Sequence, residues 1–566
     1  MKNTVKITLL SALIAGVVLT AQMGVSAVQP KVTYLEQNWT DDDREYFYFA
    51  DQGSRLLPYD YFLQLEQAGS TDLFRSDANM KRVGLIPAAK SKNNPDALPI
   101  GLARNGDHMG PTCAACHTQQ ITYQNETIHI DGGQAFWHLN QFLSDLTASL
   151  KATLESPEKF DRFQARVLGD SASDKQKEAL KQDLQATYEK RHSHMMHNHS
   201  DVASGNTRLD AFGAILNQAL LATGVDGNRN SPNAPTSIPY IWDTPQHDYV
   251  EWNGSQSNTG VGALARNIGE VIGVFGAIET ETTKWLGFID GGYSSSIQTS
   301  ELRKLEHVVS TLHSPLWPAS FPKIDATLAK QGRGLYEQHC VQCHVDINRI
   351  DPKRLIQVRM STVGEIKTDP LMAENAIYFK GKSGKFEGRP RYYFAGDALP
   401  AEAPAIHIAN NIMVGIVKNN PLQAYLAKRD AKKLGHPDVN RPPKYVDGKI
   451  IEKGQEVSDH ALLAYKARPL NGVWTSAPFL HNGSVPNLYQ LLLPAKDRVK
   501  HFHLGSWEFD PKNVGYVDVA TEGDFVFDTT LLGNSNVGHE YGTGAYGKPA
   551  LTEDERWALV EYLKTL

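Results

Sequence analysis

The stretches Cys113-Ala114-Ala115-Cys116-His117 and Cys340-Val341-Gln342-Cys343-His344 contain all four cysteines of the 566-residue chain. In each stretch, two thiols three positions apart can bond the two vinyl groups of one haem, and the next residue can supply an axial nitrogen to the iron. Because the chain has only 20 histidines, chance places one after a given CxxC about 3–4% of the time. The two stretches therefore predict two covalently attached haem c groups, with His117 and His344 as iron ligands.

Two other uses of the cysteines fit the same spacing. Four thiolates can bind one zinc ion, and a CxxC pair can form a redox-active disulfide. A zinc ribbon usually brings its pairs within a few tens of residues, whereas these pairs begin at Cys113 and Cys340. A thioredoxin-like pair follows a buried strand, and no Val/Ile-rich stretch precedes either pair. Haem attachment is therefore favoured, and it leaves no cysteine for a disulfide.

Length and composition are those of a globular protein of two or three domains. Hydrophobic residues make up 41% of the chain and charged residues 21%, which are ordinary values for such a protein. The net charge is −6, and no basic block stands out. Nucleic acid is therefore not expected as a partner.

The N-terminus has the pattern of an export signal. Positive charge at Lys2 and Lys6 precedes a short apolar run over Ile7–Leu19, and Val25-Ser26-Ala27 is a small-x-small cleavage site. We expect cleavage after Ala27, so that residues 1–27 are a signal peptide. An uncleaved membrane anchor is the alternative, although the run is short for a span of ~20 residues. The pattern predicts a periplasmic or secreted protein without stable membrane insertion.

The rest of the chain predicts a mainly α fold of two c-type cytochrome domains, each with one covalently bound haem, plus long loops and little strand. We expect an N-terminal haem c domain over 28–313 with a helical insertion, a Pro-rich linker over 314–325, and a C-terminal cytochrome c domain over 326–566. The irregular stretch 225–260 is rich in Asn, Pro, Gly and Trp. An irregular segment of that length inside a domain is usually functional.

Several local patterns predict particular helices. Thr40 followed by three aspartates is typical of a helix start, and Phe136 to Glu189 is helical in pattern, with breaks at Pro157 and near Gly169. The tract from His192 to His199 holds four His and two Met. It could bind copper or zinc, but nothing in the sequence sets a geometry, and a surface loop is the preferred interpretation.

The C-terminal domain has the order of a small cytochrome c. A helix over Ala326–His339 should run into Cys340, with Gly334 and Tyr336 available for close packing. A last helix should open at Thr552 and close over the first one.

Three further blocks carry a resemblance to a known family. The longest is Arg468-Pro-Leu-Asn-Gly-Val-Trp-Thr-Ser-Ala-Pro-Phe-Leu-His-Asn-Gly-Ser-Val-Pro-Asn-Leu488. The second is Gly533–Gly542. The third consists of two short segments, Asn233–Thr236 and Trp252-Asn253-Gly254. These blocks resemble the bacterial di-haem cytochrome c peroxidases and their larger relatives, the rubber oxygenases. The resemblance covers about Asn38 to Leu566 and is strongest in the last hundred residues.

The resemblance implies two haems with different roles. One haem is six-coordinate and passes electrons, and the other has an open distal position where peroxide or oxygen is activated. His117 and His344 correspond to the proximal ligands, and His539 stands where the family places the distal ligand of the electron-transfer haem. Bis-His ligation gives that haem a lower potential than His/Met ligation. A surface loop histidine is the alternative for His539.

The resemblance also implies catalytic residues. Trp252 matches the tryptophan between the two haems, with Trp242 as a competing candidate and plain packing as the alternative. Glu270 stands where peroxidases carry a distal glutamate, which can move a proton between the peroxide oxygens; a solvated helix residue is the alternative. Rubber oxygenases have an apolar distal pocket instead. His481 would bond a haem propionate or serve packing alone.

Three functions follow, in order of preference. The first is a peroxidase-like oxidoreductase that reduces hydrogen peroxide at the open haem with electrons from a small periplasmic donor. The second is a haem dioxygenase that uses O2 on an apolar substrate, an unsaturated lipid or polyisoprene; the chain length favours it, because simple di-haem peroxidases are much shorter. The third is an electron carrier without catalysis. The sequence leaves open whether a calcium ion binds between the two domains.

Overall fold

The computed structural model describes residues 32–436, 445–446, 449–450, 463–521 and 523–566, so the signal peptide expected at 1–27 lies outside them. The fold is helix-rich, as predicted, at 38% helix, but strand reaches 17% and is more than the little expected. The strands of the described residues form only small sheets of two or three strands each. None of the described helices combines the length and apolarity that a membrane crossing needs.

Two three-stranded sheets frame the first CxxCH motif. The middle strand of one sheet, β4, leads into the one-turn helix α4, which Thr112 caps by accepting a hydrogen bond from the Ala114 amide. The predicted cap of α1 by Thr40 is confirmed, and Asp43 bonds back to the Thr40 amide. The elements are β1 (Val32–Tyr34), α1 (Asp41–Phe49), β2 (Leu57–Pro58), α2 (Tyr59–Gln64), α3 (Asp77–Arg82), β3 (Leu102–Asn105), β4 (His108–Pro111), α4 (Cys113–Cys116), β5 (Thr118–Tyr123) and β6 (Glu126–Asp131).

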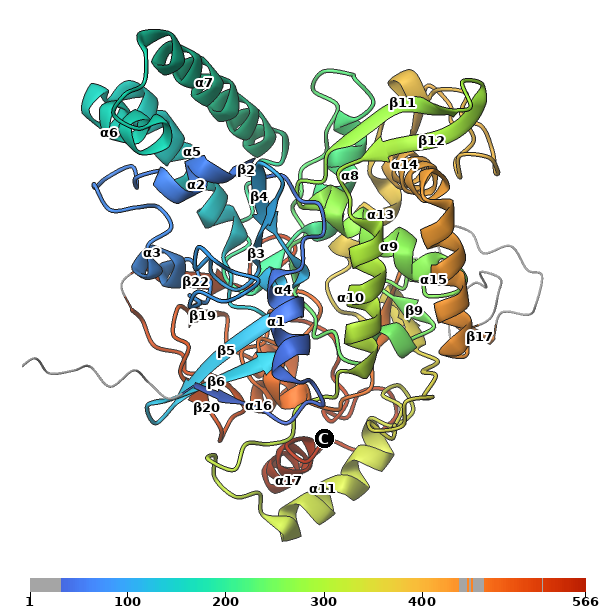
Figure 1. The fold of residues 1–566 in the computed structure, drawn as a ribbon. Helices are drawn as coiled ribbons and strands as arrows, with labels where there is room; N and C mark the ends of the chain where they lie inside the picture. Colours follow the sequence, from blue (N-terminus) through green and yellow to red (C-terminus); the bar gives the residue numbers. More distant parts are fainter. Residues whose placement is uncertain (1–31, 437–444, 447–448, 451–462, 522) are drawn as a thin grey trace, which may run out of the picture.

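Three consecutive helices lie at the upper left of Figure 1, in the part of the chain where a helical insertion is expected. They are α5 (Leu139–Glu155), α6 (Pro157–Leu168) and α7 (Asp174–His197), and the predicted breaks at Pro157 and Gly169 are confirmed. Pro157 occupies the first turn of α6, where its missing amide hydrogen costs nothing. The loop expected over the histidine tract is wrong for residues 192–197, which form the last turns of α7.

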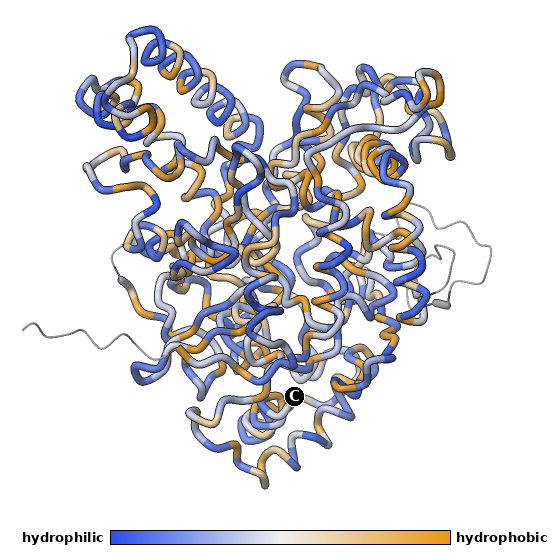
Figure 2. The backbone as a smooth tube through the Cα atoms, viewed as in Figure 1, coloured by the Kyte–Doolittle hydropathy of each residue, from blue (hydrophilic) through white to orange (hydrophobic). Residues whose placement is uncertain are grey.

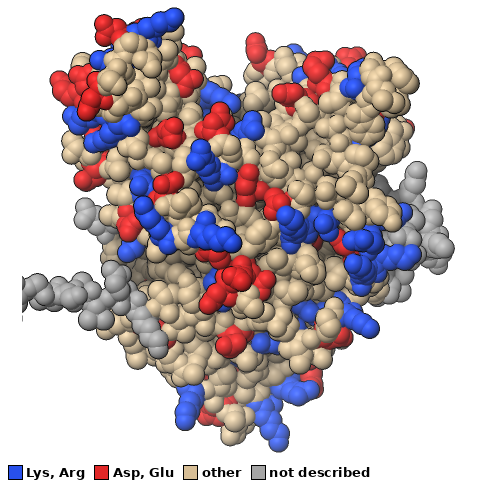
Figure 3. All heavy atoms as spheres, in the orientation of Figure 1, with Lys and Arg blue, Asp and Glu red and all other residues tan. Residues whose placement is uncertain are grey.

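The middle of the chain builds a second lobe at the upper right of Figure 1. Its core is shared by α8, α9, α14 and β12, whose apolar residues form one buried cluster. Figure 3 shows a hollow between the two upper lobes. The elements are β7 (Arg208–Leu209), α8 (Ala211–Leu221), β8 (Thr236–Ser237), η1 (Thr244–Gln246), β9 (Tyr249–Val250), β10 (Gln256–Ser257), α9 (Gly262–Gly273), β11 (Ile278–Trp285), β12 (Ile289–Ser295), α10 (Thr299–Thr311), α13 (Leu371–Tyr378), β14 (Lys380–Lys382), η2 (Gly384–Phe386), β15 (Glu402–Pro404), α14 (Ala405–Asn419) and α15 (Pro421–Lys433).

The second CxxCH motif follows α11, and α17 packs across that helix, as predicted (Figure 1). Gly332, rather than the expected Gly334, provides the close approach, because a Cβ there would lie 2.0 Å from the Ala558 carbonyl oxygen. Tyr336 stacks at a tilt on Tyr562 with 5.2 Å between ring centroids. The remaining elements are α11 (Ala326–His339), β13 (Arg359–Thr362), α12 (Val363–Ile366), β16 (Tyr445–Val446), β17 (Lys449–Ile450), β18 (Ala464–Ala467), η4 (Val473–Thr475), α16 (Leu488–Leu491), η5 (Ala495–Asp497), β19 (His501–Leu504), β20 (Phe509–Asp510), β21 (Gly515–Tyr516), β22 (Phe525–Asp528) and α17 (Glu553–Leu563).

The stretch expected as a linker is packed rather than extended into solvent. Ser314 is fully buried, and Phe321 joins a core cluster that runs from Trp39 to Leu563. The Trp474 indole donates a hydrogen bond of 3.2 Å to the Pro315 carbonyl. Figure 2 shows hydrophobic colour spread through the interior of the molecule. The two expected cytochrome units therefore share one apolar core.

Candidate haem sites

Both CxxCH motifs line large cavities. The first cavity encloses about 1550 Å³ and the second about 1380 Å³, counting the mouth of each. Both volumes include open solvent at the mouth of the cavity. Cys113, Cys116 and His117 line the first cavity, while Cys340, Cys343 and His344 line the second.

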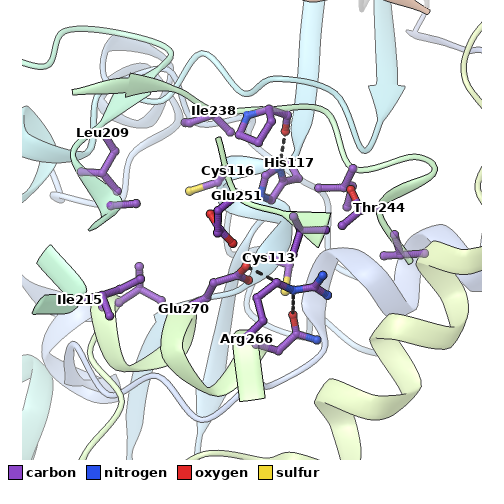
Figure 4. Close-up of a pocket in the computed structure, with 18 of the residues that line it drawn as sticks. Cys113, Cys116, His117, Leu209, Ile215, Ile238, Thr244, Glu251, Arg266 and Glu270 are labelled. Atoms are coloured by element: carbon purple, nitrogen blue, oxygen red, sulfur yellow. Dashed lines mark hydrogen bonds and ion pairs between the residues drawn. The ribbon is translucent and has the colours of Figure 1, made fainter. Parts of the chain in front are cut away.

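The first histidine is oriented by a backbone carbonyl. His117 Nδ1 donates a hydrogen bond of 2.9 Å to the Pro239 oxygen (Figure 4), which leaves Nε2 as the nitrogen with a free lone pair. Burial lowers the pKa of His117 to about 4. The imidazole is therefore neutral at pH 7, which is the form that binds a metal.

Glu270 lies in the same cavity, on α9 and four residues from Arg266. Figure 4 shows its carboxylate pointing into the space below His117, and 47% of its side-chain surface is accessible there. Arg266 makes its short ion pair elsewhere, with Glu306 at 2.5 Å, and its Nε lies 3.7 Å from Glu270. The accessible surface of Glu270 faces the cavity rather than bulk solvent, so the carboxylate loses solvation. This loss and the negative charges of Glu251 and Glu306 outweigh the positive charge of Arg266 and raise the pKa of Glu270 to about 8.

The remaining surface beside Glu270 is largely apolar. Glu251 and Glu306 are the other carboxylates of the wall, and Glu251 lies near Glu270 (Figure 4). The aliphatic and aromatic residues of this side come from β7, α8 and the end of α9: Leu209, Ala211, Phe212, Ala214, Ile215 and Val274. Within the described part of the chain, no histidine other than His117 and no methionine lines this cavity.

The second cavity holds two facing histidines. His344 Nδ1 donates a hydrogen bond of 2.6 Å to the Arg468 carbonyl, so its Nε2 is free in the same way as that of His117. The ring centroids of His344 and His539 lie 6.1 Å apart. Two imidazole nitrogens on opposite sides of one metal are about 4 Å apart, and the ring centres lie beyond the nitrogens. The separation therefore fits one iron between the rings.

The backbone at His539 is held in an unusual conformation. His539 adopts a left-handed φ of 50°, and its amide donates to the Ile366 carbonyl at 3.0 Å. Gly538 has a φ of 76°, and a Cβ there would lie 2.3 Å from the Lys367 backbone, so only glycine fits. Burial and the nearby His344 lower the pKa of His539 to about 3, so this ring is also neutral.

Trp252 stands between the two cavities. It lines both of them, and its indole donates to the Ser237 carbonyl at 2.9 Å. Trp242 lines neither cavity; it is fully buried and stacks on Tyr240 at 4.3 Å. His481 lines only the second cavity and stacks on Tyr465 at 3.9 Å, and burial lowers its pKa to about 3.

Sequence reasoning missed two basic side chains in the wall between the cavities. Arg468 and Lys466 line both cavities and are buried. The Arg468 atoms Nε and Nη2 have no hydrogen-bond acceptor within the protein, and burial lowers the pKa of Lys466 well below its usual value. Buried donors of this kind call for an anionic group, and haem propionates would supply one. Lys466 lies on β18 and Arg468 directly follows that strand, and their positions gave no sequence signal, because a strand pattern does not show what a side chain faces.

The donor sets fit covalent haem. Each cavity combines two thiols, a neutral histidine with an oriented Nε2, and shared buried cations. Among the described residues, no group of three or more His, Cys, Asp and Glu side chains is placed to hold a bare metal ion. The histidine tract forms no such group either: His194 packs on Phe275 at 4.9 Å, and His197 bonds the Asn217 carbonyl at 2.8 Å.

Comparison with known proteins agrees with a c-type cytochrome that carries covalent haem. Residues 464–503 match a family model described as RoxA-like, cytochrome c-like. That segment contains Lys466, Arg468 and His481, and the match implies a c-type cytochrome with covalent haem and a haem oxidoreductase by class.

Two relatives come from Sinorhizobium fredii (strain NBRC 101917 / NGR234). Protein y4iJ is 32% identical over 607 aligned positions, which cover 95% of this chain and 93% of y4iJ. Protein y4iM is 26% identical over 60% of this chain and 67% of its own. Both are described as uncharacterized. The chain belongs to the family of y4iJ.

Proposed function

We propose that this protein is an exported di-haem c-type oxidoreductase with peroxidase-like activity. One observation carries the proposal: Glu270, with its pKa raised to about 8, points into the cavity that His117 lines. A group with a pKa near the working pH is the most effective acid–base catalyst. Bound haem would supply the iron that takes up electrons and binds the oxidant.

The residues of the first cavity suit peroxide reduction. The Glu270 carboxylate would accept a proton from one peroxide oxygen and return it to the other, which becomes the oxygen of the departing water. Two electrons and two protons convert hydrogen peroxide into two waters, and a small periplasmic donor would supply the electrons. The lining offers no second histidine and no methionine among the described residues, which disfavours a pure electron carrier.

The residues of the second cavity suit electron entry. His344 and His539 would hold one haem from both sides, which leaves no position for a substrate. Trp252 borders both cavities, so it would relay electrons from the second site to the first. Arg468 and Lys466 lie in the same wall. They would bind haem propionates and so fix the position of one haem relative to the other.

A dioxygenase is the second candidate. The apolar wall formed by Leu209, Phe212, Ile215 and Val274 favours it, because such a wall can bind a hydrocarbon chain beside the open position. The resemblance to the rubber oxygenases points the same way. In this reading O2 replaces peroxide, and an unsaturated lipid or polyisoprene is the substrate.

One experiment separates the two candidates. The purified two-haem protein is given oleic acid or polyisoprene latex in an oxygen electrode without peroxide, and in parallel hydrogen peroxide with a reduced small cytochrome c. Peroxide-dependent oxidation of the cytochrome without oxygen uptake supports the peroxidase. Substrate-dependent oxygen uptake that heat abolishes overturns it in favour of the dioxygenase. Glu270→Gln is compared with Glu279→Gln, an exposed glutamate on β11, and only the first should lose peroxide turnover.

A further inference from the structure

The two backbone segments that orient His117 and His344 are bonded to each other. The first, residues 239–243, contains the carbonyl that accepts from His117, and the second, residues 468–471, contains the carbonyl that accepts from His344. Each segment holds one proline, whose ring fixes its own φ and restricts the residue before it. Both segments are therefore stiff, and the bonds between them fix the two carbonyls relative to each other.

Tyr240 joins the segments at a point next to both carbonyls. It directly follows Pro239, and its hydroxyl donates a hydrogen bond of 2.5 Å to the Pro469 carbonyl. Pro469 in turn directly follows Arg468, so one hydroxyl links the neighbours of the two carbonyls that hold the histidines. Only 8% of the Tyr240 surface is exposed, so water competes little for this bond.

The ring of Tyr240 is held on both of its faces. Trp242 stacks on it with 4.3 Å between ring centroids and 11° between the ring planes. The Arg468 guanidinium carbon lies 3.7 Å from the same Tyr240 centroid. Two groups this close to one ring centroid must lie on opposite faces, because one face has no room for both. The Tyr240 hydroxyl therefore cannot turn away from Pro469 without displacing one of them.

Two further hydrogen bonds join the segments beyond Tyr240. The Trp242 indole donates to the Asn471 carbonyl at 2.9 Å, and the Asn471 side chain donates to the Asp243 carboxylate at 2.5 Å. Asp243 is buried and also accepts from Arg354 at 2.6 Å. These bonds hold the far ends of the segments together, whereas the Tyr240 hydroxyl acts beside the two carbonyls themselves.

We propose that Tyr240 is a positioning residue for both haem sites. Its hydroxyl keeps both carbonyls within hydrogen-bond distance of Nδ1 of His117 and His344. A hydrogen bond at Nδ1 makes an imidazole a stronger electron donor to a metal bound at Nε2, and stronger donation favours oxidised iron and lowers its potential. Loss of the hydroxyl would weaken both bonds, so the potentials of both haems should rise. The inference rests on the two haems of the proposed function, but not on whether the oxidant is peroxide or O2.

An optical redox titration of the intact two-haem protein tests the inference. Tyr240→Phe keeps the ring and removes only the hydroxyl. We expect the ratio of reduced to oxidised haem at a fixed potential to increase severalfold at both sites. Tyr336→Phe is the matched control, because the buried Tyr336 hydroxyl donates to the carbonyl of His344 itself at 2.8 Å, so the first midpoint should stay unchanged. Tyr59→Phe, whose buried hydroxyl bonds Asp96 at 2.6 Å and lines neither cavity, should change neither midpoint.

The titration separates the inference from the proposed function. If only one midpoint rises in Tyr240→Phe, or neither does, the inference is overturned and the proposed function stands. Equal rises at both sites in Tyr336→Phe would also overturn it, because they would show a general loosening of the protein. If Tyr240→Phe does not retain both haems, Trp242→Phe replaces it, which removes the bond to Asn471 and should raise both midpoints by less. A wild-type chain with a single haem, counted by mass spectrometry beforehand, would contradict the two-haem function and the inference together.

Discussion

Two backbone carbonyls orient the histidines of both CxxCH motifs in the same way. The Pro239 oxygen accepts from His117 Nδ1, and the Arg468 oxygen accepts from His344 Nδ1. Each bond selects one tautomer and directs Nε2 into its cavity. Because both carbonyls belong to the wall shared by the cavities, a movement of that wall would reach both histidines.

We expect Glu270 to set the pH dependence of the proposed peroxide reaction. Its raised pKa of about 8 keeps the carboxyl protonated at pH 7, so the proton-accepting form increases as the pH rises. We expect the rate of peroxide turnover to climb through pH 8 and then level off. Glu270→Gln should lower the rate about 10²–10⁴-fold and remove the climb, while Glu279→Gln keeps it. If the rate of peroxide turnover still rises with pH in Glu270→Gln, a group other than Glu270 causes the rise.

His539 should set the potential of the second haem. Replacing the imidazole by a thioether in His539→Met should raise that potential by on the order of 100 mV, within the ~0.8 V range that axial ligands span. An optical redox titration measures it, and the other haem should keep its midpoint. His501→Met, an exposed histidine on β19, is the control. Equal potentials in wild type and His539→Met would show that His539 is not a ligand.

At the scale of elements, the crossing of α11 and α17 depends on one glycine. A Cβ at Gly332 would lie 2.0 Å from the Ala558 oxygen and 2.8 Å from the Tyr562 Cβ. We expect Gly332→Ala to destabilise the protein by about 1–3 kcal/mol, measured by denaturant unfolding of the haem-loaded protein. Gly334 on the same helix has open space around its Cβ position. Gly334→Ala should therefore be neutral or stabilise by up to about 1 kcal/mol. Equal effects of the two changes would contradict this packing.

At the scale of the whole molecule, both cavities should carry covalent haem. Mass spectrometry of the denatured chain should find two haem groups, and the measurement does not depend on correct folding. Cys113→Ser/Cys116→Ser and Cys340→Ser/Cys343→Ser should each retain one. A wild-type chain with a single attached haem, or with none after acid extraction, would contradict the assignment of two sites.

The sequence by itself determined the features that depend on neighbouring residues. The Thr40 cap, the breaks at Pro157 and Gly169, and the helix over Ala326–His339 could all be predicted, because spacing and capping act within a few positions. The histidine tract was misplaced because His192–His197 continues a long helix whose pattern was taken to end earlier.

The tertiary structure decided the chemistry of the cavities. His344 and His539 face each other although they are almost two hundred positions apart in the sequence. Trp252 lines both cavities, which only the folded chain forms. The raised pKa of Glu270 depends on desolvation and on Arg266 pairing with Glu306 instead. The unpartnered Arg468 donors depend on burial in the same way. Desolvation is a property of the surrounding fold, and no local pattern of residues records it.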